Sequence, residues 1–125
     1  MPRGHRPFVA IAEAKRMAVW WGFELIEMVT DTIHPFDFAI YDEGSTSVVR
    51  VRRLKYALYG TDSILRNCAQ QIKEFREMAL PEGIIRELWV RGPKRAAWHR
   101  YRILPDTIEE VTNIPEPESS VNENT

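Results

Sequence analysis

The sequence predicts an α/β (α+β) domain in which helices flank a mixed β-sheet, with the element order αβββαββ. Segments with apolar residues at helical spacing alternate with short segments rich in β-branched and aromatic residues. A polar turn joins two of the expected strands as a hairpin, and a long helical segment then separates this hairpin from the next strand. Such a crossover favours a parallel strand pair within a mixed sheet. The length of 125 residues suits one domain.

A helix is expected from Pro7 to Trp21, because apolar residues recur at spacings of three and four. Pro7 suits a first helical position, and Gly22 suits the left-handed residue after the helix end. The next segment, Phe23 to Val29, is rich in strand-forming residues and precedes polar residues. It is the first expected strand.

Residues 36–55, FDFAIYDEGSTSVVRVRRLK, predict a β-hairpin. Its first strand runs from Pro35 to Tyr41, its turn is Asp42-Glu43-Gly44, and its second strand runs from Ser47 to Arg53. Alternation along the first strand places Phe36, Phe38 and Ile40 on one face and Asp37, Ala39 and Tyr41 on the other. Along the second strand it places Val49 and Val51 on one face and Val48, Arg50 and Arg52 on the opposite face.

The crossover helix is expected to be capped by Thr61 or Asp62 and to run to about Ala79, since its apolar residues form one stripe. Strands follow at Ile84 to Val90 and at Ala97 to Leu104, joined by a basic turn. A last short helix is expected over residues 107–111 after Pro105-Asp106. The ordered domain is expected to span residues 1–112, and 113–125 to form an acidic, disordered tail.

The composition, 44% hydrophobic and 28% charged residues, is typical of a soluble globular protein. The longest apolar run is far shorter than the ~20 residues that span a bilayer, and the start of the chain does not resemble a signal peptide. We therefore expect a cytoplasmic location and no membrane partner. The single cysteine, Cys68, falls in the helical stripe and is expected to be a buried, inert thiol. The three histidines lack the spacing of zinc ligands.

The net charge of −1 hides an uneven distribution along the chain. All 17 basic residues and 12 of the 18 acids precede Pro105, so the body has a formal charge of +5 and the remaining 6 acids give the end of the chain −6. A mildly basic body permits nucleic-acid binding without requiring it.

The element order, with Asp37 near the start of the second strand and Arg50-Val51-Arg52 near the end of the third, resembles the PD-(D/E)XK nuclease superfamily. That superfamily includes archaeal Holliday junction resolvases and restriction-endonuclease-like domains. The resemblance runs from about Phe8 to Leu104 and implies a three-layer, restriction-endonuclease-like core. Asp37 matches the first acid of the motif, and Glu13 matches an acid that junction resolvases add from their first helix. The family's E-x-K triplet is here Arg50-Val51-Arg52.

This departure bears directly on activity. In the family, carboxylates bind Mg²⁺, which requires oxygen ligands, and the lysine activates the attacking water. Arginine offers no lone pair, and a guanidinium ~4 Å from a divalent ion costs several kcal/mol, with about 4 kcal/mol for each pair of unit charges at a dielectric near 20. We therefore expect a pseudoenzyme without a metal cofactor. An ion pair between Asp37 and Arg50 or Arg52 is predicted to occupy the former metal position.

Two interpretations of this pair stay open: it only neutralises a leftover acid, or it belongs to a basic groove that binds DNA or RNA. The residues expected to line that groove are Arg50, Arg52, Arg53, Lys55, Lys94 and Arg95. One alternative is an active nuclease with a relocated carboxylate from Glu13, Glu24 or Glu27, in which Asp37 and Glu13 would bind Mg²⁺. Another is a homodimeric interaction module.

Overall fold

The computed structural model describes residues 8–26, 36–55, 60–92 and 98–111. Within these ranges the strands form one six-stranded sheet in the order β1-β2-β3-β4-β5-β6. β3 and β4 pair in parallel and the other neighbours pair antiparallel, so the expected mixed sheet is confirmed. The elements in chain order are α1 (Phe8–Trp20), β1 (Glu24–Ile26), β2 (Phe38–Asp42), β3 (Ser45–Arg53), α2 (Gly60–Asn67), α3 (Ala69–Glu77), β4 (Ile85–Arg91), β5 (Trp98–Ile103) and β6 (Ile108–Val111).

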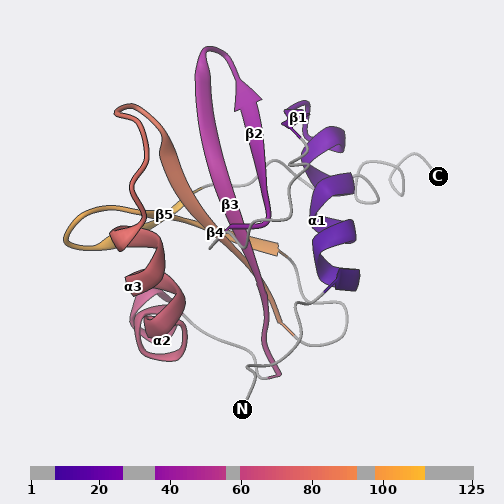
Figure 1. Ribbon diagram of the computed structural model, residues 1–125. Helices are drawn as coiled ribbons and strands as arrows, with labels where there is room; N and C mark the ends of the chain where they lie inside the picture. The colour runs from indigo at the N-terminus through magenta and orange to yellow at the C-terminus, as the bar shows by residue number, and fades with distance from the viewer. Residues whose placement is uncertain (1–7, 27–35, 56–59, 93–97, 112–125) are drawn as a thin grey trace.

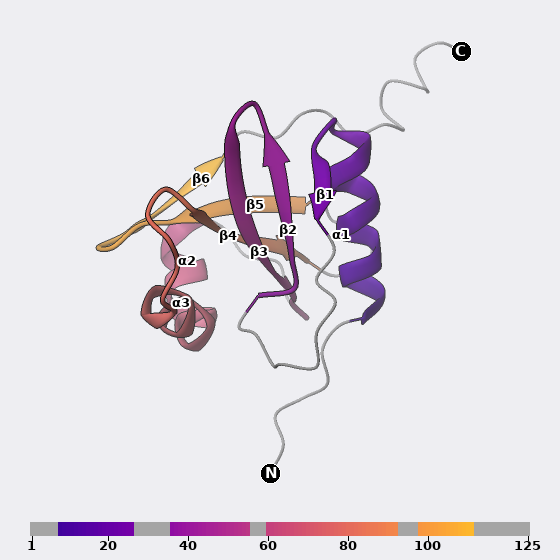
Figure 2. The same cartoon turned by 45° about the horizontal axis from the view of Figure 1, so that its top comes forward.

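The molecule has three layers, because α1 lies on one face of the sheet and α2 and α3 lie on the other (Figure 1). Figure 2 shows the same separation from a second direction, with β6 at the edge opposite β1. Each face of the sheet has its own apolar cluster. The α1 side includes Phe38, Val49, Val51 and Trp89, and the α2/α3 side includes Val48 and Leu88 with the helix stripe.

The first helix agrees with its prediction. Ala10, Ala14 and Ala18 are buried against the sheet, where small side chains let the helix approach closely. Gly22 ends the helix at φ +96°, in the left-handed region that favours glycine.

The hairpin is confirmed in its turn and in its second strand. Glu43 and Gly44 both have positive φ, at 50° and 86°, as in the tight turns that suit twisted strands. In β3, Val49 and Val51 face α1 while Val48 faces the other helices, as alternation requires. The predicted face of Phe36 is wrong, because it packs with Ala39 on the α2/α3 side. A bend at 36–37 precedes β2, so strict alternation does not extend back to this residue.

The crossover helix is interrupted at Cys68, where φ is −119° and ψ is 25°. The apolar stripe continues across this break, since Ile64, Cys68, Ile72 and Phe75 are all buried, so spacing alone does not reveal it. The predicted cap is also wrong. α2 begins at Gly60, which places Thr61 and Asp62 inside its first turn.

The predicted helix over residues 107–111 is wrong, because this segment contains β6, which pairs antiparallel with β5. Thr107, Ile108 and Val111 are β-branched, Ile108 is buried, and the Leu104 N–H closes the turn on the Thr107 carbonyl at 2.9 Å. No helix among the described residues is long and apolar enough to cross a membrane. Residues 113–125 lie outside the described ranges, so the tail and the domain boundary stay predictions.

Candidate functional site

Asp37 lies at the start of β2, against the backbone of β3. Its N–H donates to the Val49 carbonyl at 2.7 Å, and its Oδ2 accepts the Val51 N–H at 2.7 Å. The carboxylate therefore lies beside the Arg50-Val51-Arg52 triplet, as the resemblance implies. Because Oδ2 already accepts a backbone hydrogen bond, fewer lone pairs of the Asp37 carboxylate are available to bind a metal ion.

Arg50 points to the α2/α3 side of the sheet and is half-buried. Its Nη1 lies 3.7 Å from Oε1 of Glu74 in α3, which is an ion-pair distance but too long for a hydrogen bond. The acid beside Arg50 is therefore Glu74 of α3, which was not among the predicted site residues. The predicted ion pair between Asp37 and an arginine stays a prediction.

Arg52 is half-buried two residues further along β3, close to Cys68. Burial raises the pKa of the Cys68 thiol above its ordinary value, and the positive charge of Arg52 offsets part of that rise. Cys68 has no exposed surface, so the prediction of a buried thiol is confirmed.

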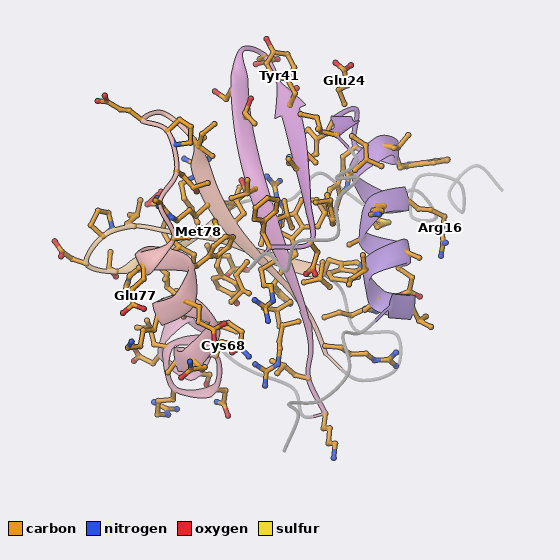
Figure 3. All side chains as sticks on the ribbon, in the orientation of Figure 1. Arg16, Glu24, Tyr41, Cys68, Glu77 and Met78 are labelled. Atoms are coloured by element: carbon orange, nitrogen blue, oxygen red, sulfur yellow. The ribbon has the colours of Figure 1, made fainter. Side chains whose placement is uncertain are left out.

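Arg53 and Lys55 are exposed at the carboxyl end of β3. The parallel register places Arg53 beside Arg91 of β4, and the Leu54 N–H donates to the Arg91 carbonyl at 2.9 Å. Because parallel strands end at the same edge of a sheet, the positive charges of both strands meet there. In Figure 3, side chains ending in nitrogen gather around the part of β3 far from the β2–β3 turn. Lys94 and Arg95 lie outside the described residues.

Arg91 was not among the predicted site residues. Its Nη1 forms an ion pair with Oε1 of Glu13 on α1, and its guanidinium carbon lies 5.8 Å from the ring centroid of Trp98. This arginine therefore joins α1 to the end of β4. The family resemblance singles out Glu13 as a candidate acid. Its cationic partner, Arg91, is 78 residues away in the sequence, and no local pattern predicts their pairing.

The other candidate carboxylates are those of Glu24 and Glu27. Glu24 is exposed on the edge strand β1, near Tyr41 and far from the middle of the sheet (Figure 3). Glu27 lies outside the described residues. Of the four tryptophans, Trp20 is exposed and the other three are buried in the core.

A buried ion pair on the α1 side was also missed by sequence reasoning. Glu87 of β4 accepts from Arg100 of β5 at 3.2 and 3.3 Å and from the indole N–H of Trp89 at 2.8 Å. The Arg100 guanidinium carbon lies 5.1 to 5.6 Å from the ring centroids of Phe23, Trp89 and Trp21. The sequence signal is the spacing of two residues between Glu87 and Trp89 in β4 and between Trp98 and Arg100 in β5. This spacing places each charged residue on the same face of the sheet as the tryptophan of its strand. This cluster is closed to solvent and belongs to the core.

The described residues do not fit a divalent metal. They contain no group of three or more His, Cys, Asp or Glu side chains placed to hold an ion. Asp37 supplies one carboxylate whose Oδ2 is already hydrogen-bonded, and residues 50 and 52 of the adjacent strand β3 are arginines. Magnesium prefers several oxygen ligands in octahedral order, which this donor set does not provide.

Comparisons with known proteins place the fold. No family model matches the sequence, and no curated protein matches it. The 1.6 Å resolution structure of Archaeoglobus fulgidus Hjc, a Holliday junction resolvase from an archaeal hyperthermophile, superposes with a TM-score of 0.55 at 16% identity. The match covers 85% of this chain and 88% of that chain. The chain therefore has the fold of this archaeal Holliday junction resolvase, as the resemblance led us to expect.

Proposed function

We propose that this chain is a nuclease-like domain without catalytic activity that binds nucleic acid through basic residues at the carboxyl edge of β3 and β4. One observation is central to the proposal. Asp37 keeps its place beside the motif strand through its hydrogen bond with Val51, while Arg50 and Arg52 stand where the superfamily has its glutamate and lysine.

The proposed loss of catalysis follows from the chemistry of arginine. A guanidinium has no lone pair for a metal and stays protonated at any ordinary pH, so it replaces neither a carboxylate ligand nor a general base. Glu74 lies beside the Arg50 guanidinium, so this acid already has a positive charge next to it. We therefore propose that the domain needs no metal cofactor.

The proposed binding surface comprises Arg52, Arg53 and Lys55 of the β3 end, with Arg91 beside them and Lys94 and Arg95 following in the sequence. Arg53 and Lys55 are exposed, which suits contact with phosphates. Arg50 is paired with Glu74, so its proposed contribution is smaller. The structural neighbour is a Holliday junction resolvase, which makes a four-way DNA junction the first ligand to test.

The binding test uses a labelled four-way junction, duplex DNA and single-stranded RNA at several salt concentrations. We expect a linear fall of log affinity with log salt, because phosphate contacts release counterions. Replacing both Arg53 and Lys55 by glutamine should reduce the magnitude of the slope by about 2, roughly one for each lost contact. The matched control is Arg66→Gln, at an exposed site on α2, and it should leave the slope unchanged.

The catalytic test incubates the same substrates with Mg²⁺ or Mn²⁺, and calorimetry measures metal binding. No cleavage and no heat of binding are expected. Cleavage that disappears in Asp37→Ala would instead show an active nuclease with a relocated carboxylate. Absent or salt-independent binding to every nucleic acid would leave an interaction module as the remaining function.

The expected homodimer is part of the same proposal, because large apolar side chains are exposed on α1 and on the neighbouring strands. A cytoplasmic location also belongs to it, since nucleic acid is accessible there.

A further inference from the structure

We infer that two copies of the chain pair through the outer face of α1, with the two helices antiparallel across a two-fold axis near the middle of the helix. This inference supplies a contact surface for the proposed homodimer and rests on that part of the proposed function. One contact links it to the proposed nucleic-acid surface, because Arg91 pairs with Glu13 of α1. The variants that test it are at Arg16 and Trp20, which do not belong to that surface.

The exposed apolar surface is concentrated on one side of the molecule. Every large hydrophobic side chain exposed in the described part of the chain belongs to α1, β1 or β2: Val9 (68%), Val19 (57%), Trp20 (60%), Ile26 (38%) and Tyr41 (42%). Scattered single exposures would be ordinary, but three of these lie on one short helix. In Figure 1 the outer side of α1 faces away from the sheet and from the other helices.

Helix α1 is apolar on two faces, and the sheet covers only one of them. Ala10, Ile11, Ala14 and Ala18 are buried against the sheet. The exposed residues Val9, Ala12, Arg16 and Val19 are separated by three, four and three positions along the helix. This is the spacing of the contact seam between two packed helices. Trp20, which follows Val19, is also exposed. A helix of this pattern is expected to be covered on both sides.

Charge complementarity selects a second copy as the occupant. Glu13 is partly exposed on the side of α1 that reaches Arg91, and Arg16 lies on the exposed face three residues later. An antiparallel pairing therefore places Glu13 of each copy opposite Arg16 of the other. The same pairing places Val9 opposite Trp20 at both ends. A parallel pairing would instead oppose arginine to arginine.

The groups in this pairing are accessible. Arg16 is exposed and has no ion pair within the described residues, and Figure 3 shows its side chain extending away from α1 into solvent. Arg91 contacts Glu13 through Oε1, and the side chain of Glu13 is still 28% exposed. Arg16 of the second copy would therefore add a second positive charge beside the Glu13 carboxylate, which Arg91 already holds in position.

The size of the surface limits the expected affinity. A helix of 13 residues is about 20 Å long, and one helix pair buries less than the ~800 Å² on each partner that a standard interface buries. We expect a dimer with a Kd between about 1 µM and about 1 mM.

Sedimentation velocity on the full chain across that concentration range tests the inference. Arg16→Glu would oppose two acids and Trp20→Lys would place a charge in the apolar contact, so each should raise the Kd at least about tenfold. Arg66→Glu makes the same charge change at an exposed position on α2 and should leave the Kd unchanged. Far-UV circular dichroism checks that each variant is folded.

Tryptophan emission gives a second readout. Trp20 is the exposed indole, so emission should shift to longer wavelength on dilution, and Trp20→Phe should abolish the shift while leaving most of the dimer. A monomer at all concentrations overturns the inference, as does an unchanged Kd in Arg16→Glu. A monomer whose Trp20 is shielded at every dilution would show that the chain covers this face itself. The slope of log affinity for nucleic acid against log salt concentration, measured for Arg16→Glu, tests the nucleic-acid proposal separately.

Discussion

The buried pair of Glu87 and Arg100 permits a sharp test of how the core is held together. The two residues are 2% and 6% exposed, and the Arg100 guanidinium donates to both carboxylate oxygens of Glu87. We consider the single substitutions Arg100→Met and Glu87→Met and the combined double substitution. Methionine keeps most of the volume and removes the charge.

Each single substitution should destabilise the domain by about 3 to 5 kcal/mol, because it leaves one buried charge without its counterion. After Arg100→Met, the Glu87 carboxylate would keep the Trp89 indole N–H but lose both arginine donors. After Glu87→Met, the guanidinium would keep only its contacts with three aromatic rings, each worth about 1 kcal/mol. Such losses are a large part of the roughly 5 to 15 kcal/mol that holds a domain folded.

The double substitution should be much less harmful than the sum of the single ones, within about 2 kcal/mol of the wild type, since apolar side chains then fill the site. Urea unfolding at neutral pH measures all four free energies, and the double-mutant cycle gives the coupling. A coupling below about 1 kcal/mol would refute the reasoning, as would a single variant as stable as the wild type. Lys73→Met is the control, because Lys73 pairs with Glu77 on the exposed surface of α3 and its loss should leave the free energy of unfolding nearly unchanged.

Three further predictions concern single side chains. Asp37→Ala should lower the free energy of unfolding by about 1 to 3 kcal/mol because the Val51 N–H loses its acceptor, whereas Asp37→Asn should cost less, both measured by urea unfolding. Cys68 should react with an aromatic disulfide reagent about 10³-fold more slowly in the native protein than in urea, since burial raises its pKa and blocks access; a fast native reaction would contradict its placement. Burial, followed by the charge of Glu110, raises the pKa of Tyr101 to about 12, above its ordinary value of 10.0, so the neutral form stabilises the fold below pH 10. That contribution, at most about 2 kcal/mol, should disappear as the pH rises from about 10 through about 12, and Tyr101→Phe should lack this part of the decline.

Several elements were predictable because their signal is local. The stripe of α1, the alternation of β3 and the turn at Glu43-Gly44 each depend on residues close together in sequence, and each agrees with the structure. β6 was not predictable in this way. A four-residue apolar and acidic segment fits a helix or a strand equally well, and its pairing with β5 decides between them.

The candidate site shows a similar division. The positions of Asp37 and the arginine triplet follow from the hairpin register, which local spacing sets. Neither Glu87 nor Arg100 was among the predicted site residues. Their burial depends on α1 and the aromatic residues that cover this face of the sheet, which no window of sequence contains.

The sequence by itself determined the elements from α1 to β5, apart from the break at Cys68, and with them the chemistry of the motif positions. Arg50 and Arg52 lack oxygen ligands in any conformation, because that property belongs to the guanidinium and not to the fold. Only the tertiary structure decided which charges meet. Glu74 lies by Arg50, Glu13 by Arg91 and Glu87 by Arg100, because helix packing and strand pairing bring together residues that are 13 to 78 positions apart.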